Sequence, residues 1–277
     1  MKATGARPRL VVSISISESP DMPVLGMSDQ HLQDAMYEIA THLLANGADL
    51  AYGGDLRPGG FTELLFELLY RYGDGTGGGC NVTNYLAWPV HIGMAANDID
   101  ETVSWLRHIR LRLVGRDGGD ISVRKRQRMT SRQPDEWEWP EGLTAMRRTM
   151  CSETDARVAL GGRVQDYSGR MPGVAEEVLL SLESRRPVFL LGGFGGCTRD
   201  IAETLGLVDR WAGSRPAWPG RGELERYGAE DLWNGLSLEE NRALAGSPHM
   251  GQAVPLILRG ICRLRTDKHH KGRYRKE

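Results

Sequence analysis

Short apolar runs alternate with longer segments of helical periodicity over the first two hundred residues. The run 9–17 is rich in β-branched residues and has the length of a buried strand. The segment 28–46 places an apolar residue at every third or fourth position, with Ser28 as a cap and Gly47 as a stop. The same criteria predict strands over 9–17, 48–54, 82–91, 156–162 and 187–193, and helices over 28–46, 58–73, 98–113, 143–151 and 172–185.

This alternation defines the expected fold class. Strand–helix–strand order favours an α/β, Rossmann-like fold, in which a mostly parallel sheet carries helices on both faces. The stretch of about 114–140 interrupts the pattern, because it is polar and basic and then rich in Trp and Pro. We interpret it as a long loop or insertion.

The pattern changes again after residue 210. Loops rich in Pro, Gly and Trp alternate with helices, one of which begins at a capping box of Ser237 and Glu240. We therefore expect an α/β domain over 1–210 and a helical C-terminal extension over 211–277. The extension ends in a basic tail from Arg263 to Lys276, which is either a solvated, frayed terminus or a tail that binds phosphate or a partner.

Composition narrows the function classes. The chain has 277 residues, 40% of them hydrophobic, and a net charge of -1, so it can bury a full core and nucleic-acid binding is unlikely over the whole surface. Its four cysteines contain no CxxC pair, which favours a reducing compartment and predicts no metal site. No apolar run reaches about 18 residues, so we expect a cytoplasmic protein with no membrane contact. No cofactor is expected.

Three glycine-rich turns carry the candidate chemistry, and each follows a predicted strand and precedes a helix. Ligands of open parallel sheets bind beyond the carboxyl ends of the strands, so we expect all three turns to line one crevice. Glycines let backbone N–H groups approach a phosphate, and the helix N-terminus adds partial positive charge. The alternative is that glycine is only a steric need of tight turns. The ligand-binding candidates are Gly53, Gly54, Arg57, Gly59, Gly60, Thr62, Gly161, Gly162, Arg163, Arg170, Gly173, Gly192, Gly193, Gly195 and Gly196.

The spacing of these turns argues against two common nucleotide-binding motifs. None fits the GxGxxG pattern of dinucleotide-binding folds or the GxxxxGK[ST] pattern of P-loops, so a classical dehydrogenase or ATPase is disfavoured. The second turn is followed by two adjacent acids, Glu176 and Glu177. They either face the crevice or only complement the dipole at the start of a helix.

The run from Ala145 to Gly196 resembles the core of the SLOG superfamily. That superfamily includes the Lonely guy phosphoribohydrolases and the ligand-sensing domains of Thoeris-type antiphage effectors and TRPM channels. The hydrolases carry a helix MHxRKxxM, a strand beginning S/T-D-A and a turn PGGxGTxxE. Here "MRRTMCSETDARVALGG" keeps that spacing, with Met150 and Asp155 matching, and "AYGGDLRPGGFTE" resembles the second-strand turn. "GVAEE" lies over GTxxE, which places Glu177 on the catalytic glutamate of the family.

The sequence also departs from the hydrolase motif. Val174 replaces its Thr, and the longer "QDYSGRMPG" replaces its PGG. The catalytic Arg of the family falls on Met146, with Arg147 on the adjacent Lys position. These departures resemble sensory SLOG domains, which bind NAD-derived or ADP-ribose-like nucleotides without cutting them. The resemblance covers roughly residues 8–207.

The resemblance implies binding of a nucleotide or an NAD- or ADP-ribose-derived ligand, by a sensor or effector in nucleotide signalling or antiphage defence. It leaves open a hydrolase that cleaves the N-glycosidic bond of a nucleotide or NAD, with Glu177, Glu176 and Arg147 as catalytic candidates. In that case a carboxylate would stabilise the oxocarbenium-like transition state and orient water.

A third interpretation is an assembly protein. Three tryptophans of the C-terminal third, Trp211, Trp218 and Trp233, would then mediate oligomerisation, and a homo-oligomer is expected.

Overall fold

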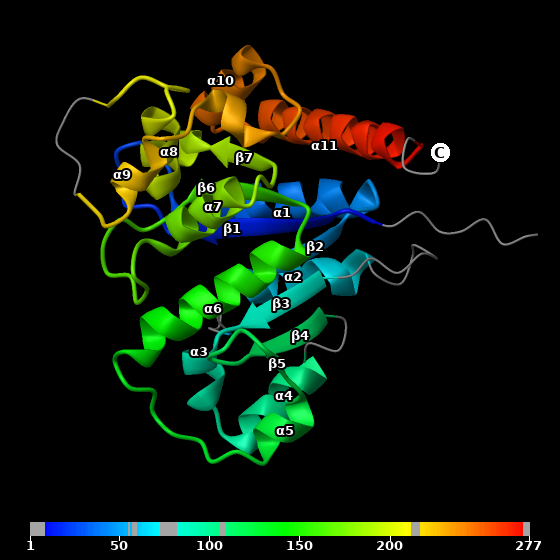
Figure 1. Cartoon of the computed structure of the whole chain (residues 1–277), viewed down its shortest axis with the longest axis vertical. Helices are drawn as coiled ribbons and strands as arrows, with labels where there is room; N and C mark the ends of the chain where they lie inside the picture. The colour runs from blue at the N-terminus through cyan, green and yellow to red at the C-terminus, as the bar shows by residue number, and fades with distance from the viewer. Residues whose placement is uncertain are drawn as a thin grey trace, which may run out of the picture.

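A seven-stranded sheet forms the centre of the molecule (Figure 1). The computed structural model describes residues 9–54, 56, 60–72, 82–105, 109–211 and 217–273. The strand order is β5-β4-β3-β2-β1-β6-β7, and every pairing is parallel except that of β4 with β5. The strands are β1 (Val11–Ser17), β2 (Asp49–Tyr52), β3 (Val82–Leu86), β4 (Ile109–Val114), β5 (Asp120–Ile121), β6 (Ala156–Gly161) and β7 (Val188–Leu191).

Helices cover both faces of this sheet, so the predicted α/β, Rossmann-like fold class is confirmed (Figure 1). One face carries α6, α7 and α8, and the other carries α1, α2 and α11. The helices are α1 (Asp29–Ala45), α2 (Phe61–Tyr72), α3 (Trp88–Ile92), α4 (Ala96–Trp105), α5 (Val123–Gln127), α6 (Glu138–Glu153), α7 (Gly173–Glu183), α8 (Gly196–Thr204), α9 (Arg221–Leu224), α10 (Leu238–Gly246) and α11 (Met250–Arg273), with 3-10 turns η1 (Gly192–Phe194) and η2 (Ala229–Leu232).

The sequence prediction misplaced two elements. The strand expected over 82–91 ends at Leu86, and Trp88–Ile92 is a helix. Pro89 explains the change, because its fixed φ suits the first turn of a helix and it cannot donate a hydrogen bond within a sheet. The helix expected over 98–113 ends at Trp105, and Ile109–Val114 is strand β4. In β4, apolar and basic side chains alternate, which is the two-residue period of a strand rather than that of a helix.

The segment 114–140, interpreted as a long loop or insertion, contains short elements of its own. It forms the hairpin strand β5 and the short helix α5, and then enters α6. Arg126 of α5 is fully buried and donates hydrogen bonds to the backbone carbonyls of His91, Ile92 and Met94. These bonds attach the segment to the carboxyl end of α3, and they give the buried guanidinium the acceptors it needs.

The C-terminal helices share the core of the sheet. Leu244 of α10 and Ile257 of α11 belong to the same buried cluster as Val158, Leu160 and Phe189 of the sheet. Deleting them would therefore expose one sheet face to water, so the extension completes a layer of the fold.

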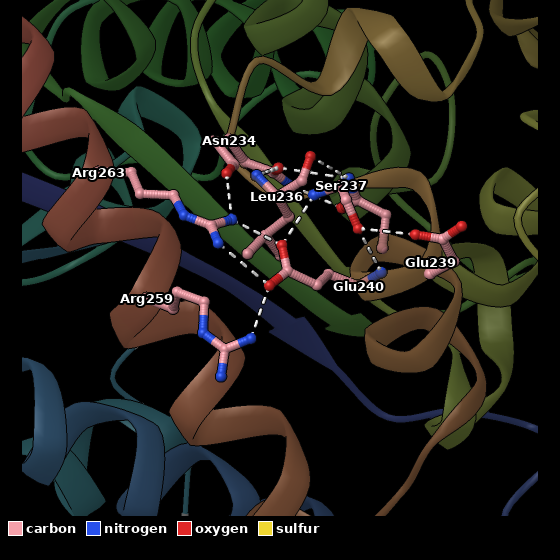
Figure 2. Close-up of polar contacts among 9 residues, drawn as sticks. Asn234, Leu236, Ser237, Glu239, Glu240, Arg259 and Arg263 are labelled. Carbon is pink, nitrogen blue, oxygen red and sulfur yellow. Dashed lines mark hydrogen bonds and ion pairs between the residues drawn. The ribbon is translucent and has the colours of Figure 1, made fainter.

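The predicted capping box at Ser237 and Glu240 is present at the start of α10, and Figure 2 shows its surroundings. The carboxylate of Glu240 also accepts hydrogen bonds from Arg259 and Arg263 of α11, each at 2.6 Å. Arg265 donates to the carbonyl of Asn46. The frayed-terminus interpretation is therefore wrong for the start of the basic tail, where Arg263 and Arg265 belong to α11 and contact other parts of the fold.

Among the described helices, none combines the length and apolar character that a membrane span requires.

Candidate functional site

The strand order creates a crevice between β1 and β6. The chain leaves β1 for β2, β3 and β4 and then returns to β6 on the other side of β1, so the connections after β1 and β6 diverge. Such a switch point is where open α/β sheets bind ligands. A pocket of about 520 Å³ lies at this place, at the carboxyl ends of β1 and β2 and against α6 and α7.

Glu177 lies in the wall of this pocket, although it is only 6% exposed. Its Oε2 accepts hydrogen bonds from Nη1 of Arg157, at 2.6 Å, and from the hydroxyl of Ser15. Its Oε1 lies 3.8 Å from Nε of Arg147. Hydrogen bonds from Arg157 and Ser15 therefore fix Oε2 of Glu177, whereas Oε1 lies beside Arg147 at the pocket.

Glu176 has a different environment. Its carboxylate accepts hydrogen bonds from Thr144 and from Arg147, both on α6. Glu176 is not among the described residues that line the pocket. The structure thus separates the two acids: Glu177 faces the pocket, whereas Glu176 orients Arg147. Both carboxylates accept hydrogen bonds from side chains of other elements. The two acids therefore do more than complement the dipole at the start of α7.

Arg147 connects the two acids. It is 8% exposed, lines the pocket, and its Nε has no hydrogen-bond partner within the described part of the chain. A Cβ added at Gly173 would lie 2.6 Å from its Nη2, and one at Gly169 would lie 2.8 Å from its Nη1. Gly169 of the turn after β6 and Gly173, the first residue of α7, therefore make room for the Arg147 guanidinium.

The N-terminus of α7 opens onto the same pocket. Gly173 and Val174 both line it, and they are the first two residues of this 11-residue helix. Backbone N–H groups in a first helical turn have no acceptor within the helix, and together with the helix dipole they attract anions. The pocket thus brings together a helix N-terminus and the carboxylate of Glu177.

The two arginines of the turn after β6 lie in different places. Arg163 lines the pocket and forms an ion pair with Glu18, at 3.0 Å. Arg170 forms an exposed ion pair with Glu141 and is not one of the described pocket-lining residues. The structure therefore supplies Arg163 but not Arg170 as a pocket cation.

The first glycine turn reaches the pocket in part. Gly53 and Gly54, directly after β2, line it. Thr62 is buried in the first turn of α2, and neither it nor Gly60 is among the described lining residues. The candidates Arg57 and Gly59 lie outside the described residues.

None of the residues of the third glycine turn is among the described residues that line this pocket, so the structure does not bring this turn together with the other two. The N-terminus of α8 is already occupied: the backbone N–H of Gly196 donates to Oδ2 of Asp21 at 2.7 Å. A Cβ at Gly195 would lie 2.5 Å from the Cβ of Asp21, and Gly192 and Gly193 pack against the backbone at the end of α10. An internal carboxylate holds the place that a phosphate would take.

The glycines at the end of β6 serve close backbone packing. Gly161 has φ +64, and a Cβ there would lie 2.5 Å from the carbonyl oxygen of Ser17. Gly162 packs in the same way against Cys197, whose thiol has its pKa raised by burial. Gly161 and Gly162 therefore fit the alternative in which glycine is present because a larger side chain would collide with its neighbours.

Sequence reasoning missed the residues that hold Glu177. Arg157 of β6 is 1% exposed and donates to Ser15 at 2.5 Å and to Ser181 at 2.7 Å, as well as to Glu177. The available signal was an arginine inside the apolar run "ARVALGG", since a buried charge requires a partner. No cluster of three or more metal-ligating side chains occurs within the described residues.

These features define a class: an α/β domain with a ligand pocket at the switch point of its sheet, formed by a helix N-terminus and a buried carboxylate. A family model described as SLOG cluster2 matches residues 7–226, and the chain belongs to this family. Membership supports a nucleotide-related function in general. A search of curated proteins gave no match.

Proposed function

We propose that the pocket binds a nucleotide or an NAD-derived ligand and that the protein is a sensor or effector in nucleotide signalling or antiphage defence. The observation that supports the proposal is that the N-terminus of α7 and the carboxylate of Glu177 line the same pocket. Its volume of about 520 Å³ is typical of small-molecule sites.

The parts of a nucleotide fit different parts of the pocket. Phosphate oxygens would accept hydrogen bonds from the backbone N–H groups of Gly173 and Val174 and from Arg163. Ribose hydroxyls would donate to Oε1 of Glu177. The rings of Tyr167 and Trp139, which also line the pocket, offer surfaces for a base.

Binding without turnover is the favoured form of this function. Oε2 of Glu177 already accepts hydrogen bonds from Arg157 and Ser15, so only Oε1 remains to orient water. The alternative is a hydrolase of the N-glycosidic bond. It is supported by Arg147, whose Nε lies 3.8 Å from Glu177 and has no hydrogen-bond partner among the described residues.

Calorimetric titration with AMP, ADP-ribose and NAD tests the proposal, and chromatography of the same mixtures detects any released base. Glu177→Gln should weaken binding about 10- to 100-fold, the scale of one hydrogen bond to a charged group. Glu183→Gln is the matched control, because Glu183 lies on the same helix in an exposed ion pair with Arg226.

Thermal unfolding of each variant without ligand separates lost binding from lost folding. Equal affinities in the two variants, or no binding of any of these ligands to the wild type, would overturn the proposed function. Release of base by the wild type but not by Glu177→Gln would replace the sensor with the hydrolase.

A further inference from the structure

The candidate pocket has one wall that carries no charge. Residues 87–146 contribute this apolar wall, and none of the described residues within that range that line the pocket is charged. The wall includes Pro89, Val90, Pro134, Trp139 and Leu143, with Gln133 as its one side-chain amide. The charged residues that line the pocket all lie outside this range: Glu18, Arg147, Arg163, Asp166 and Glu177.

A segment between α5 and α6 supplies part of the apolar wall. Residues 129–139, called the strap below, include Gln133, Pro134 and Trp139. The strap is attached to the end of α3: the hydroxyl of Ser131 donates to the carbonyl of Met94 at 2.6 Å, and the backbone N–H of Arg132 donates to the carbonyl of Ile92 at 3.2 Å. The polar and basic insertion in the sequence therefore contributes to the candidate site.

Glu138 closes the strap on itself. Its carboxylate is fully buried and accepts two hydrogen bonds from the guanidinium of Arg132, each at 2.6 Å. It also accepts hydrogen bonds from Nε1 of Trp88 and from the backbone N–H of Asp135, each at 2.9 Å. The hydrogen bond from Arg132 lowers the pKa of Glu138 to about 2, so the carboxylate is ionised at neutral pH.

The position of Glu138 in the chain links this carboxylate to the pocket. Glu138 directly precedes Trp139, and its partner Trp88 directly precedes Pro89. One buried carboxylate thus ties together the strap, the start of α6 and the start of α3, which all contribute to the apolar wall.

A wall of this composition suits an uncharged planar group. A phosphate placed there would lose hydration without gaining a cation, whereas a heterocyclic ring stacks on indole and packs against proline and aliphatic groups. An amide beside the ring can pair with the donors and acceptors at its edge.

We propose that the strap determines the specificity of the pocket for the base of its ligand. Gln133 binds the edge of the base, Trp139 contacts its face, and Glu138 is a positioning residue that holds both in place. The inference rests on the proposed function and deepens it, because it assigns the recognition of the base to the insertion.

Titration of AMP and ribose 5-phosphate into the full chain tests this inference, because the two ligands differ by the base. The wild type should bind AMP at least about tenfold more tightly, the scale of one stacked base. Glu138→Gln places an amide nitrogen against donors that need acceptors, so the variant should lose most of this ratio and keep its affinity for ribose 5-phosphate. A merely structural role would weaken the binding of both ligands.

Arg132→Met opens the same clasp from its partly exposed side and should give the same selective loss, so it serves if Glu138→Gln does not fold. Glu141→Gln is the matched control. Glu141 lies one turn further along α6 in an exposed ion pair with Arg170, and it is not among the described residues that line this pocket. That variant should keep the wild-type ratio.

Gln133→Glu tests the contact with the base edge. A carboxylate only accepts hydrogen bonds, guanine presents two adjacent donors at its N1 and N2, and adenine presents one donor beside an acceptor. The variant should therefore shift the ratio of GMP to AMP affinity toward GMP by about tenfold, the scale of one bidentate contact. An unchanged ratio would remove Gln133 from the base edge and overturn that part of the inference.

Wild-type affinities for AMP and ribose 5-phosphate that agree within about twofold, or an unchanged ratio in folded Glu138→Gln and Arg132→Met, would overturn the role of the strap while leaving binding in the pocket intact. If neither ligand binds the wild type, both proposals fall.

Discussion

Two neighbouring strands of this sheet, β6 and β7, each end in a glycine-rich turn that leads into a helix, yet the two helix ends differ. The N-terminus of α7 opens into the pocket through Gly173 and Val174. The N-terminus of α8 is closed, because the carboxylate of Asp21 accepts a hydrogen bond from Gly196. A glycine turn before a helix therefore leads either to a helix end that borders a pocket or to one that the protein's own carboxylate caps.

The lengths of the two connections account for much of this difference. Residues 162–172 join β6 to α7, long enough to leave the sheet and form a pocket wall around Arg147. Residues 192–195 join β7 to α8, so the glycines there stay between the strands and the end of α10. Both connections use glycine for close approach, but only the longer one faces a space.

The largest effect on stability is expected at the buried ion pair of Arg157 and Glu177, near the N-terminus of α7. Arg157→Met should lower the free energy of unfolding by about 3–5 kcal/mol, because it leaves a buried carboxylate without its counterion. The double variant Arg157→Met, Glu177→Gln should recover a large part of that loss. Urea unfolding measures the stability of the single and the double variant.

Arg226→Met, which breaks the exposed pair with Glu183, is the control and should cost no more than about 1 kcal/mol. A similar loss in the two single variants would contradict the difference in burial.

Alanine at the first residue of each helix should distinguish the two turns. Gly196 has φ +65, and a Cβ there would collide with the backbone carbonyl of Gly162, so Gly196→Ala should lose roughly 2–4 kcal/mol. Gly173→Ala would press only on the end of the Arg147 side chain, which can shift. We expect that variant to lose less than about 1 kcal/mol in stability and to bind nucleotides more weakly. Equal destabilisation of the two variants would remove the distinction between a packed and an open turn.

Removing the internal cap should make the closed helix end resemble the open one. Asp21→Ala should cost about 1–2 kcal/mol, the range for a lost N-cap carboxylate. Inorganic phosphate should then raise the melting temperature of this variant more than that of the wild type, because an anion can take the place of the carboxylate. Asp29→Ala serves as the control for loss of one surface acid. An unchanged melting temperature in Asp21→Ala would show that the hydrogen bond to Gly196 does not stabilise α8.

The smallest effect on stability is expected at the N-terminus of α10, which the Glu240 side chain caps. The hydrogen bond from Arg263, with those from the Ser237 N–H and Arg259, lowers the pKa of Glu240 to about 2 (Figure 2). Since the folded pKa lies below the ordinary value of 4.5, its stabilisation is present above pH 4.5 and is lost as the pH falls toward 2. Glu240→Ala should cost about 1 kcal/mol at pH 7, and its difference from the wild type in melting temperature should shrink at pH 3. Glu240→Gln keeps the capping geometry and isolates the charge. A difference independent of pH would contradict the ion pairs.

The sequence alone determined the fold class and the alternation of strands and helices outside residues 82–140. The period of apolar residues and the caps of α1 and α10 are local properties, so they predicted most helices and strands within a few residues. Local reasoning failed where an element was short, as in Trp88–Ile92, or where basic residues in 109–114 obscured a strand. The sequence also identified Glu177 as a pocket candidate, through its place just after a glycine turn.

Only the tertiary structure decided which turn forms a site. Asp21 is 175 positions away from the helix end that it caps, and Ser15 is 162 positions away from the carboxylate that it binds. Neither pairing leaves a periodic or spacing signal, because a charge or a hydroxyl is satisfied by whatever lies near it in space. Glycine content shows where the backbone can approach closely, whereas the packing of distant segments determines whether the approaching group is a ligand or the protein itself.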